Sequence, residues 1–517
     1  MSESQRDAPP RRLHALAGRR RAAFGLAAVA AAALLAGVLC ARADDEPADD
    51  AARLVPSGAL VYVHLSTDPD RDPDARLAEL VERLPALARL RDRVAGGIAA
   101  RPLDLERDVR PWLGDELAYA AVSPADSVVL AAVADRGEAQ ALVDRIGDLD
   151  AAERYEGVPV LVVGPTTVAF VGEFLAVGTE AAVHAAVDRD QGAGEPLFEV
   201  PAYRRATADG PEERSLDAYA SAAGVRTVLA QGDGPLGVLG ALLDRPGLTA
   251  AGASLTAEER GLRVRVRLAG GAPRDAAFEP MLLERVPEAA AAYAGIRSAL
   301  RIGRVLGRLG LPRPLGRLGD ALAEDAGIEL ERDLLAPLSG ELAIAVTRAE
   351  SGIPVVTLKA RTADPRRTGS ALARLQEPLA RRLAVPGTVP AFQTAQIGGV
   401  EAFTLRVTPE LAPSYAVADG SVVISTTPSG LEPPRGTLAA APAFDATIGE
   451  VPDRADSLVF LDLRALLALG EQTGLTAIPG LAAARDDLSR VRAAGAVIAA
   501  DPAHPSDTTA ELFLEIP

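Results

Sequence analysis

The feature that most constrains the fold of this chain is a long internal repeat. The segment Leu105-Glu106-Arg107-Asp108 recurs 225 residues later as Leu330-Glu331-Arg332-Asp333. Four further pairs keep the same order at offsets of up to 243 residues: Val55-Pro56 with Val286-Pro287, Gly157-Val158 with Gly399-Val400, Pro201-Ala202-Tyr203 with Pro442-Ala443-Phe444, and Ala250-Ala251-Gly252-Ala253 with Ala493-Ala494-Gly495-Ala496. The period is too long for a solenoid, so the pattern predicts a domain duplication. The copies span residues 53–270 and 284–517, joined by a linker over residues 271–283.

Each copy is expected to be an α+β unit. The β-branched runs Val128-Val129-Leu130 and Val355-Val356-Thr357-Leu358 predict strands, and Asp419-Gly420 is a strong signal for a tight hairpin turn. Apolar residues at helical spacing from Leu77 to Val94 predict a helix that breaks or kinks at Pro85. Because hairpins link the strands, we expect two tandem copies of a mostly antiparallel sheet with helices on one face.

The repeated Leu-Glu-Arg-Asp motif is expected to be structural. Apolar residues recur at every fourth position through it: Leu105, Val109, Leu113 and Leu117. Pro111 interrupts any helix, so the motif predicts a short helix, a turn and then a strand near Glu116. The leucines should be buried, and the acids Glu106 and Asp108 should lie on the surface.

The N-terminus has the pattern of a membrane anchor. Five arginines precede an uncharged stretch over residues 22–41: Arg11, Arg12, Arg19, Arg20 and Arg21. Twenty helical residues span about 30 Å, the thickness of the bilayer core, and the positive charge ahead of them predicts that residues 1–21 stay in the cytoplasm. The acidic residues 42–52 are expected to form a disordered linker, and the body that follows should be extracytoplasmic.

A cleaved signal peptide is the alternative to this transmembrane or signal-anchor helix. Ala41-Arg42-Ala43 matches a cleavage site, and cleavage after Ala43 would give a secreted protein. We favour the uncleaved anchor because the apolar run is longer than the usual core of a signal peptide. A lipoprotein signal at Cys40 is disfavoured because the bulky Leu39 precedes the cysteine.

The charge of the chain limits its partners. Residues 1–43 contain seven arginines and two acids, which gives them a net charge of +5. Because the formal net charge of the whole chain is −17, the remaining residues carry −17 − 5 = −22. An acidic body argues against binding to nucleic acid, which needs a basic surface. Cys40 is the only cysteine. This excludes a disulfide within the chain and a metal site built on cysteine.

Two motifs resemble binding sites, and a structural role is favoured for both. Five carboxylates have the spacing of a calcium loop: Asp68, Asp70, Asp72, Asp74 and Glu79. Pro73 occupies the position where such a loop needs glycine, so we favour a helix that begins near Asp72. Gly232-x-Gly234-x-x-Gly237 has the spacing of a dinucleotide fingerprint. No strand is expected before it, so a loop is favoured.

The basic and aromatic candidates are weaker still. The four histidines (His14, His64, His184 and His504) are not spaced as zinc ligands. A basic island includes the candidate contacts with an anionic surface: Arg297, Arg301, Arg304 and Arg308. A basic amphipathic helix can lie on anionic lipid, but a solvated helix face over the core is the favoured interpretation. Trp112, the only tryptophan, is expected to fill the core of the first copy.

Three segments carry a resemblance to a known family: Val55-Pro56 with Leu60-Val61-Tyr62, Pro111-Trp112-Leu113-Gly114, and Phe174-Leu175-Ala176-Val177-Gly178. Through them, residues 53–517 resemble an uncharacterised, membrane-anchored bacterial family catalogued as a domain of unknown function (number 3352). The second copy departs from the pattern, with Ala336-Pro337-Leu338-Ser339 where the first has Pro-Trp-Leu-Gly. The family has no assigned activity, so the resemblance implies no mechanism.

Together these patterns favour a non-catalytic binding or scaffolding module at the cell envelope, with an unknown protein or apolar ligand as its partner. The chain contains no G-x-S-x-G or H-E-x-x-H motif, and we expect neither enzyme activity nor a cofactor or metal. Two alternatives stay open. One is a carrier that holds an apolar ligand or lipid in a cavity. The other is an envelope hydrolase whose serine, histidine and acid the fold brings together, with His64 or His184 as the base.

The anchor prediction can be tested with a reporter fused after Pro517. We expect activity from a reporter that works only outside the cytoplasm, because the arginines ahead of residue 22 hold the N-terminus inside. Activity from a reporter that works only in the cytoplasm would contradict the predicted orientation. An intact mass that begins at Asp44 would show that the segment is cleaved.

Overall fold

The structure is a computed structural model that describes residues 49–68, 71–83, 105–145, 147, 152–208, 210–229, 246–271, 277–297, 321, 324–348, 353–384, 391–408, 411–473, 485 and 488–517. The chain divides into two compact units, Met1–Ala272 and Pro273–Pro517, called unit 1 and unit 2 below. No helix of the described ranges is long and apolar enough to cross a membrane. The predicted anchor at residues 22–41 lies outside these ranges.

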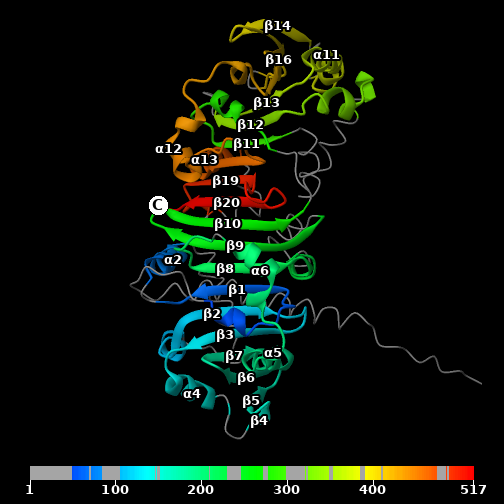
Figure 1. Cartoon of the computed structure of the whole chain (residues 1–517). Helices are drawn as coiled ribbons and strands as arrows, with labels where there is room; N and C mark the ends of the chain where they lie inside the picture. Colours follow the sequence, from blue (N-terminus) through cyan, green and yellow to red (C-terminus); the bar gives the residue numbers. More distant parts are fainter. Residues whose placement is uncertain are drawn as a thin grey trace, which may run out of the picture. The chain divides into compact units, whose positions relative to one another are not determined.

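The described part of unit 1 contains a ten-stranded sheet (Figure 1). Its strands are β1 (Val61–Ser66), β2 (Leu113–Ala121), β3 (Ser127–Val133), β4 (Glu153–Tyr155), β5 (Val158–Val163), β6 (Thr166–Val171), β7 (Phe174–Gly178), β8 (Leu216–Ser221), β9 (Leu248–Glu258) and β10 (Gly261–Gly270). They pair in the order β4-β5-β6-β7-β3-β2-β1-β8-β9-β10. Every pair is antiparallel, which confirms the predicted strand arrangement for this unit.

Helices cover both faces of this sheet. They are η2 (Ala51–Arg53), α2 (Asp72–Arg83), η3 (Leu105–Val109), α4 (Arg136–Asp144), α5 (Glu180–Asp190), η4 (Leu197–Glu199), α6 (Pro201–Thr207), α7 (Ala222–Gly224) and η5 (Val225–Leu229). Leu130 of β3 packs in one cluster with Val183 of α5, and its neighbour Ala131 packs in another with Leu142 of α4. The expectation of helices on one face is therefore wrong. The central strands are apolar on both sides, so both sides need cover.

Unit 2 also pairs ten described strands: β11 (Ala292–Arg297), β12 (Glu341–Arg348), β13 (Pro354–Arg361), β14 (Phe392–Ile397), β15 (Val400–Leu405), β16 (Ser414–Ala418), β17 (Ser421–Ser425), β18 (Ser457–Asp462), β19 (Ala493–Ala500) and β20 (Thr508–Glu515). Their order is β14-β15-β16-β17-β13-β12-β11-β18-β19-β20, again antiparallel throughout. This is the order of unit 1 with each strand number raised by ten.

The helices of unit 2 also lie on both faces. They are η6 (Met281–Arg285), η7 (Leu330–Leu335), α11 (Pro365–Arg382), η8 (Pro428–Leu431), η9 (Leu438–Ala440), α12 (Pro442–Ile448) and α13 (Leu463–Thr473). Leu372 of α11 packs in one cluster with Leu342 of β12. Phe444 of α12 packs in a second cluster with Ala343, the next residue of the same strand. Successive strand residues point to opposite faces, so α11 and α12 cover opposite sides.

Several local predictions are confirmed. Val128-Val129-Leu130 lies in β3, and the predicted hairpin joins β16 to β17 through Asp419 and Gly420. Both turn residues have positive φ, 52° and 67°, which a two-residue turn of this type requires. Trp112 is buried in the core of unit 1, where its ring nitrogen donates to the Asp108 carbonyl oxygen.

The repeated Leu-Glu-Arg-Asp motif forms the predicted short helix before a strand in both units, η3 before β2 and η7 before β12. Leu117 and Leu342 are buried, as expected. Asp108 is also buried, so its predicted surface position is wrong. Its carboxylate accepts from the guanidinium groups of Arg107 and Arg145 at 3.2 and 3.1 Å, and these two cations offset the loss of hydration.

The repeated Ala-Ala-Gly-Ala motif marks a close contact between a helix and a strand. A methyl group built on Gly252 in β9 would lie 1.9 Å from the Ala206 carbonyl oxygen of α6. In unit 2, a methyl group on Gly495 in β19 would lie 2.8 Å from Thr447 of α12. Glycine at both positions lets the helix backbone approach the sheet.

The predicted linkers are too long. Residues 42–52 were expected to be disordered, but Ala51 and Ala52 are fully buried and belong to the core of unit 1. Likewise, the predicted linker over residues 271–283 overlaps unit 2, because Leu282 and Leu283 are buried in its core. A short apolar turn at each position packs in the core with the first strand of its unit. These turns were not predicted because acidic or proline-containing segments flank them in the sequence.

Gly252→Ala tests the close contact of α6 with β9. We expect it to lower the free energy of unfolding by about 1–3 kcal/mol, because the methyl group overlaps the Ala206 carbonyl oxygen. Gly58→Ala is the control, since no atom lies within 4 Å of a methyl group there, and it should change stability by less than about 0.5 kcal/mol. Equal denaturant midpoints for the two variants would contradict the contact.

Candidate functional site

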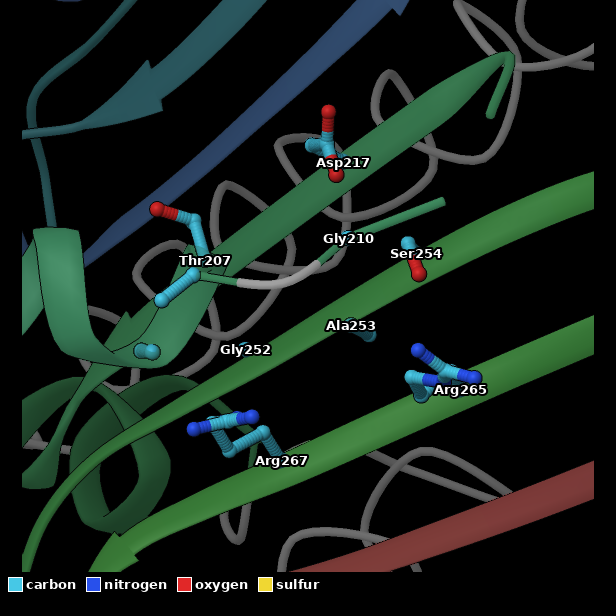
Figure 2. A pocket seen from close by; sticks show the side chains of 10 residues that line it. Thr207, Gly210, Asp217, Gly252, Ala253, Ser254, Arg265 and Arg267 are labelled. Carbon is cyan, nitrogen blue, oxygen red and sulfur yellow. The ribbon is translucent and has the colours of Figure 1, made fainter. Parts of the chain in front are cut away.

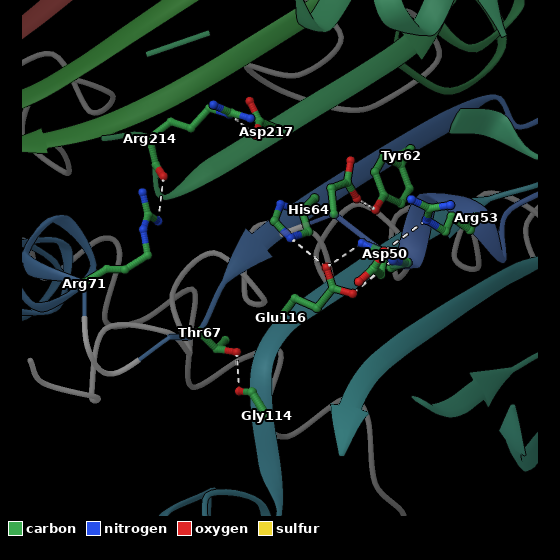
Figure 3. Close-up of polar contacts among 12 residues, drawn as sticks. Asp50, Arg53, Tyr62, His64, Thr67, Arg71, Gly114, Glu116, Arg214 and Asp217 are labelled. Carbon is green, nitrogen blue, oxygen red and sulfur yellow. Dashed lines mark hydrogen bonds and ion pairs between the residues drawn. The ribbon is translucent and has the colours of Figure 1, made fainter. Parts of the chain in front are cut away.

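A buried glutamate lies at the centre of the candidate site in unit 1. Glu116 is 2% exposed and lies on β2 opposite Ser66 of β1. Its carboxylate accepts hydrogen bonds from the backbone N–H groups of Asp50 at 3.1 Å and Ala51 at 3.0 Å (Figure 3). It therefore caps the first turn of η2 and ties the segment ahead of β1 to the sheet.

His64 of β1 faces this glutamate (Figure 3). Its Nε2 lies 3.2 Å from Glu116 Oε2, and the imidazole is only 1% exposed. Neither of its ring nitrogens makes a hydrogen bond to a described residue. Burial lowers the pKa of His64, but the nearby carboxylates of Glu116, Asp49 and Asp217 outweigh it, so the pKa is raised overall.

Asp49 completes the acidic part of the site. Both of its carboxylate oxygens accept from tyrosine hydroxyls, one from Tyr62 of β1 and one from Tyr203 of α6. The two rings pack edge to face with centroids 5.9 Å apart. Burial and the Asp49 carboxylate hold the pKa of both tyrosines well above the usual range, so both remain hydrogen-bond donors.

A second ion pair extends the site toward the edge of the sheet. Asp217 of β8 lies directly opposite His64 in the β1–β8 ladder. Its carboxylate accepts from Arg214 Nε at 2.5 Å (Figure 3). Arg71 in turn donates to the Arg214 carbonyl oxygen at 2.9 Å. Asp217 therefore already has a cationic partner.

The carboxylates predicted as a weak calcium motif lie beside this network. The helix α2 begins at Asp72, as expected. Asp74 is buried, and its carboxylate lies 3.4 Å from Arg71 Nη1. Its contacts are thus internal to the fold. Asp70 lies outside the described residues.

A small hollow of about 20 Å³ lies beyond Asp217 on the same face of the sheet (Figure 2). Its polar lining includes Thr207 at the end of α6, Ser254 of β9, and Arg265 and Arg267 of β10. Ser254 lies opposite both Asp217 and Arg265 in the strand ladders. A continuous row of polar side chains therefore joins buried His64 to this hollow.

Unit 2 lacks this row. Counted along β1 and β11, the fourth residue is His64 in unit 1 and Gly295 in unit 2. In unit 1 the strand pairing continues this row through Asp217, Ser254 and Arg265. In unit 2 the same pairing leads from Gly295 to Leu458, Val497 and Glu511. What unit 2 keeps is the capping glutamate, because both Glu341 oxygens accept from the Leu282 backbone N–H at 3.0 and 2.9 Å.

The other predicted site residues do not join the cluster. Arg297 ends β11 and donates to the Ala277 carbonyl oxygen at 3.2 Å. Its companions Arg301, Arg304 and Arg308, the glycine-rich segment from Gly232, Cys40 and His14 all lie outside the described residues. His184 of α5 stacks on Tyr155 of β4, and His504 is exposed in a loop.

Sequence reasoning missed the cluster because its members are far apart in the chain. His64 lies 52 residues before Glu116 in the numbering, and Tyr203 lies 87 residues after Glu116. The repeat did carry one signal, since Glu116 and Glu341 occupy the same place in it. A glutamate that recurs where a strand begins, between apolar neighbours, indicates a buried carboxylate with a fixed partner.

The described residues thus form an α+β protein of two antiparallel units, one of which carries a buried polar cluster. The chain belongs to the family described as Protein of unknown function (DUF3352), whose match covers residues 21–516. No curated protein matches the chain. Crystal form I of TP0453 is similar with a TM-score of 0.28 and 14% identity, covering 44% of this chain and 81% of that one. For crystal form III the values are 0.29, 14%, 44% and 82%, and neither likeness carries an argument about function.

The buried capping glutamate of unit 2, Glu341, predicts how the stability of the fold depends on pH. Burial outweighs its backbone donors and raises the pKa of Glu341 from 4.5 to about 7. Between these values the folded chain keeps a proton that the unfolded chain has lost, so the free energy of unfolding should fall as pH rises. Glu341→Gln should flatten this fall, measured as thermal unfolding from below pH 4.5 to above pH 7.

Glu401→Gln is the matched control, because Glu401 is an exposed residue of β15. The substitution removes one carboxylate, as Glu341→Gln does, but from the surface. It should unfold with the pH dependence of the parent. A Glu341→Gln variant with the same slope as the parent would show that the buried carboxyl titrates normally.

Proposed function

We propose that this chain is a membrane-tethered, extracytoplasmic binding module without catalytic activity. In this proposal it consists of two diverged copies of one unit, and unit 1 carries the binding site. The residues that meet the ligand line the hollow next to Asp217: Thr207, Ser254, Arg265 and Arg267.

One observation carries the proposal: the polar row of unit 1 has no counterpart in unit 2. Unit 2 pairs its strands in the same order with Gly295, Leu458 and Val497 in the equivalent row. The fold therefore does not need the polar residues. Burying polar and charged side chains costs free energy, so their presence in unit 1 favours a role in binding.

The duplication is supported by strand register as well as by strand order. Tyr62 lies opposite Ala120 and Tyr219 in unit 1. Tyr293 lies opposite Ala345 and Phe460 in unit 2, at the matching positions of the repeat. A one-residue slip in any of these ladders would move the tyrosine to the other face, so the shared register favours common descent over a chance likeness.

A non-catalytic role is favoured over the hydrolase alternative. A serine hydrolase needs a histidine within hydrogen-bond reach of a serine that a substrate can approach. His64 is 1% exposed, and its Nε2 faces the Glu116 carboxylate. His184 is stacked against Tyr155. Neither arrangement offers an activated nucleophile to solvent.

A small anionic ligand is favoured over an apolar one. Two arginines and two hydroxyl groups line the hollow, and the Asp217 carboxylate that also lines it is already paired with Arg214. A lipid chain would instead need an apolar channel. Guanidinium and hydroxyl groups recognise carboxylate and phosphate oxygens through charge-assisted hydrogen bonds. A phosphate or carboxylate group of a small envelope molecule therefore fits this surface.

Titration of the full chain with inorganic phosphate, followed by isothermal titration calorimetry, tests the hollow. We expect weak saturable binding that Arg265→Gln weakens by about tenfold, because one charge-assisted contact is lost. Arg263→Gln is the control, since this residue lies on the same strand outside the hollow and pairs with Glu258. Absence of phosphate binding, or equal loss in both variants, would refute the proposed site.

A further inference from the structure

We propose that Asp49, His64 and Glu116 form a binding site for a divalent transition-metal ion. This site is separate from the proposed anion-binding hollow, and each can fail without the other. It uses one carboxylate from the segment ahead of β1, the imidazole of β1 and the carboxylate of β2.

The geometry of the three side chains suits a single ion. Each offers one ligand atom, and these atoms all lie within 4.8 Å of one another. His64 Nε2 and Glu116 Oε2 are 3.2 Å apart. Ligands that sit about 2.0–2.2 Å from a common ion are separated by about 3–4 Å, so this pair already has the required spacing.

The charge of the cluster calls for a cation. Asp49 and Glu116 carry two negative charges, and the nearby Asp217 is already paired with Arg214. A protonated His64 would balance only one of the two. The cluster would then keep a net negative charge in a buried place, which is costly. A divalent ion with neutral His64 as its third ligand balances both carboxylates.

The histidine supplies the second, independent observation. His64 is 1% exposed, its Nε2 lies 3.2 Å from Glu116 Oε2, and neither of its ring nitrogens makes a hydrogen bond to a described residue. A buried imidazole that has so few hydrogen bonds is destabilising unless another group engages it. Coordination through Nε2 would supply that group.

The groups around the carboxylates hold them as ligands should be held. Tyr62 and Tyr203 donate to the two oxygens of Asp49, and the backbone N–H groups of Asp50 and Ala51 donate to those of Glu116. Such hydrogen bonds fix the orientation of ligating carboxylates in metal sites. Each oxygen keeps a further lone pair for an ion.

The ligand types select the class of ion. One imidazole nitrogen with carboxylate oxygens suits Zn²⁺, Mn²⁺ or Fe²⁺, whereas Ca²⁺ and Mg²⁺ prefer oxygen ligands alone. With this ion bound, the segment ahead of β1 would be joined to the sheet by coordination as well as by the cap on η2.

The test uses the full chain, treated with a chelator and then titrated with Zn²⁺ alone. We expect one ion per chain at this site by calorimetry, and a rise in unfolding temperature that grows with Zn²⁺ concentration. Co²⁺ in place of Zn²⁺ should give visible absorption bands that report coordination directly. His64→Gln should remove the Co²⁺ bands and weaken Zn²⁺ binding by at least about tenfold.

His184→Gln is the matched control, since it removes a histidine of unit 1 outside the cluster and should leave binding unchanged. Asp49→Asn, at a partly buried position, keeps the test decisive if His64→Gln does not fold, and it should also weaken binding. The proposal is overturned if the parent binds no ion, or if the folded variants of His64 and Asp49 bind Zn²⁺ as the parent does.

Discussion

A carboxylate buried where the second strand begins holds the start of each unit in place. Glu116 and Glu341 both accept backbone N–H groups from a short turn ahead of the first strand, η2 in one unit and η6 in the other. The first strand lies in the interior of each sheet, between the second strand and the strand that follows the α6 or α12 helix. The buried carboxylate therefore ties the segment ahead of this interior strand to the sheet. The recurrence of one glutamate in both units therefore reflects a structural need.

The two units differ in what surrounds this shared bond. In unit 1, Tyr62 donates to Asp49 and lies near a second tyrosine, Tyr203. Unit 2 retains Tyr293 at the matching place, but its hydroxyl has no hydrogen-bond partner among the described residues. Phe444 occupies the position of Tyr203, and Pro280 precedes η6 where Asp49 and Asp50 precede η2. Among the described residues, the tyrosine of unit 2 therefore lacks the acidic partner that Tyr62 has in unit 1.

The sequence predicted the local elements well and the tertiary placement of polar residues poorly. The Asp419-Gly420 turn, the strand at Val128 and the helix at Asp72 follow from backbone preferences that neighbouring residues determine, so short windows sufficed. The faces covered by helices and the burial of Asp108 depend on residues distant in the chain, such as Arg145. The cluster around His64 is the extreme case, because its members come from three separate segments. Periodicity cannot reveal such a site, since each member looks ordinary among its own neighbours.

The position of η2 has a mechanical consequence. Residue 49 is where the described part of unit 1 begins, and 48 residues precede it in the chain. Any pull transmitted along those residues reaches the sheet first at Asp49 and at the two backbone bonds to Glu116, before it loads the β1 ladders. We expect these few hydrogen bonds to break before the strand pairing does, because they carry the load first. Their loss would release the segment ahead of β1 and leave the ten strands of unit 1 paired.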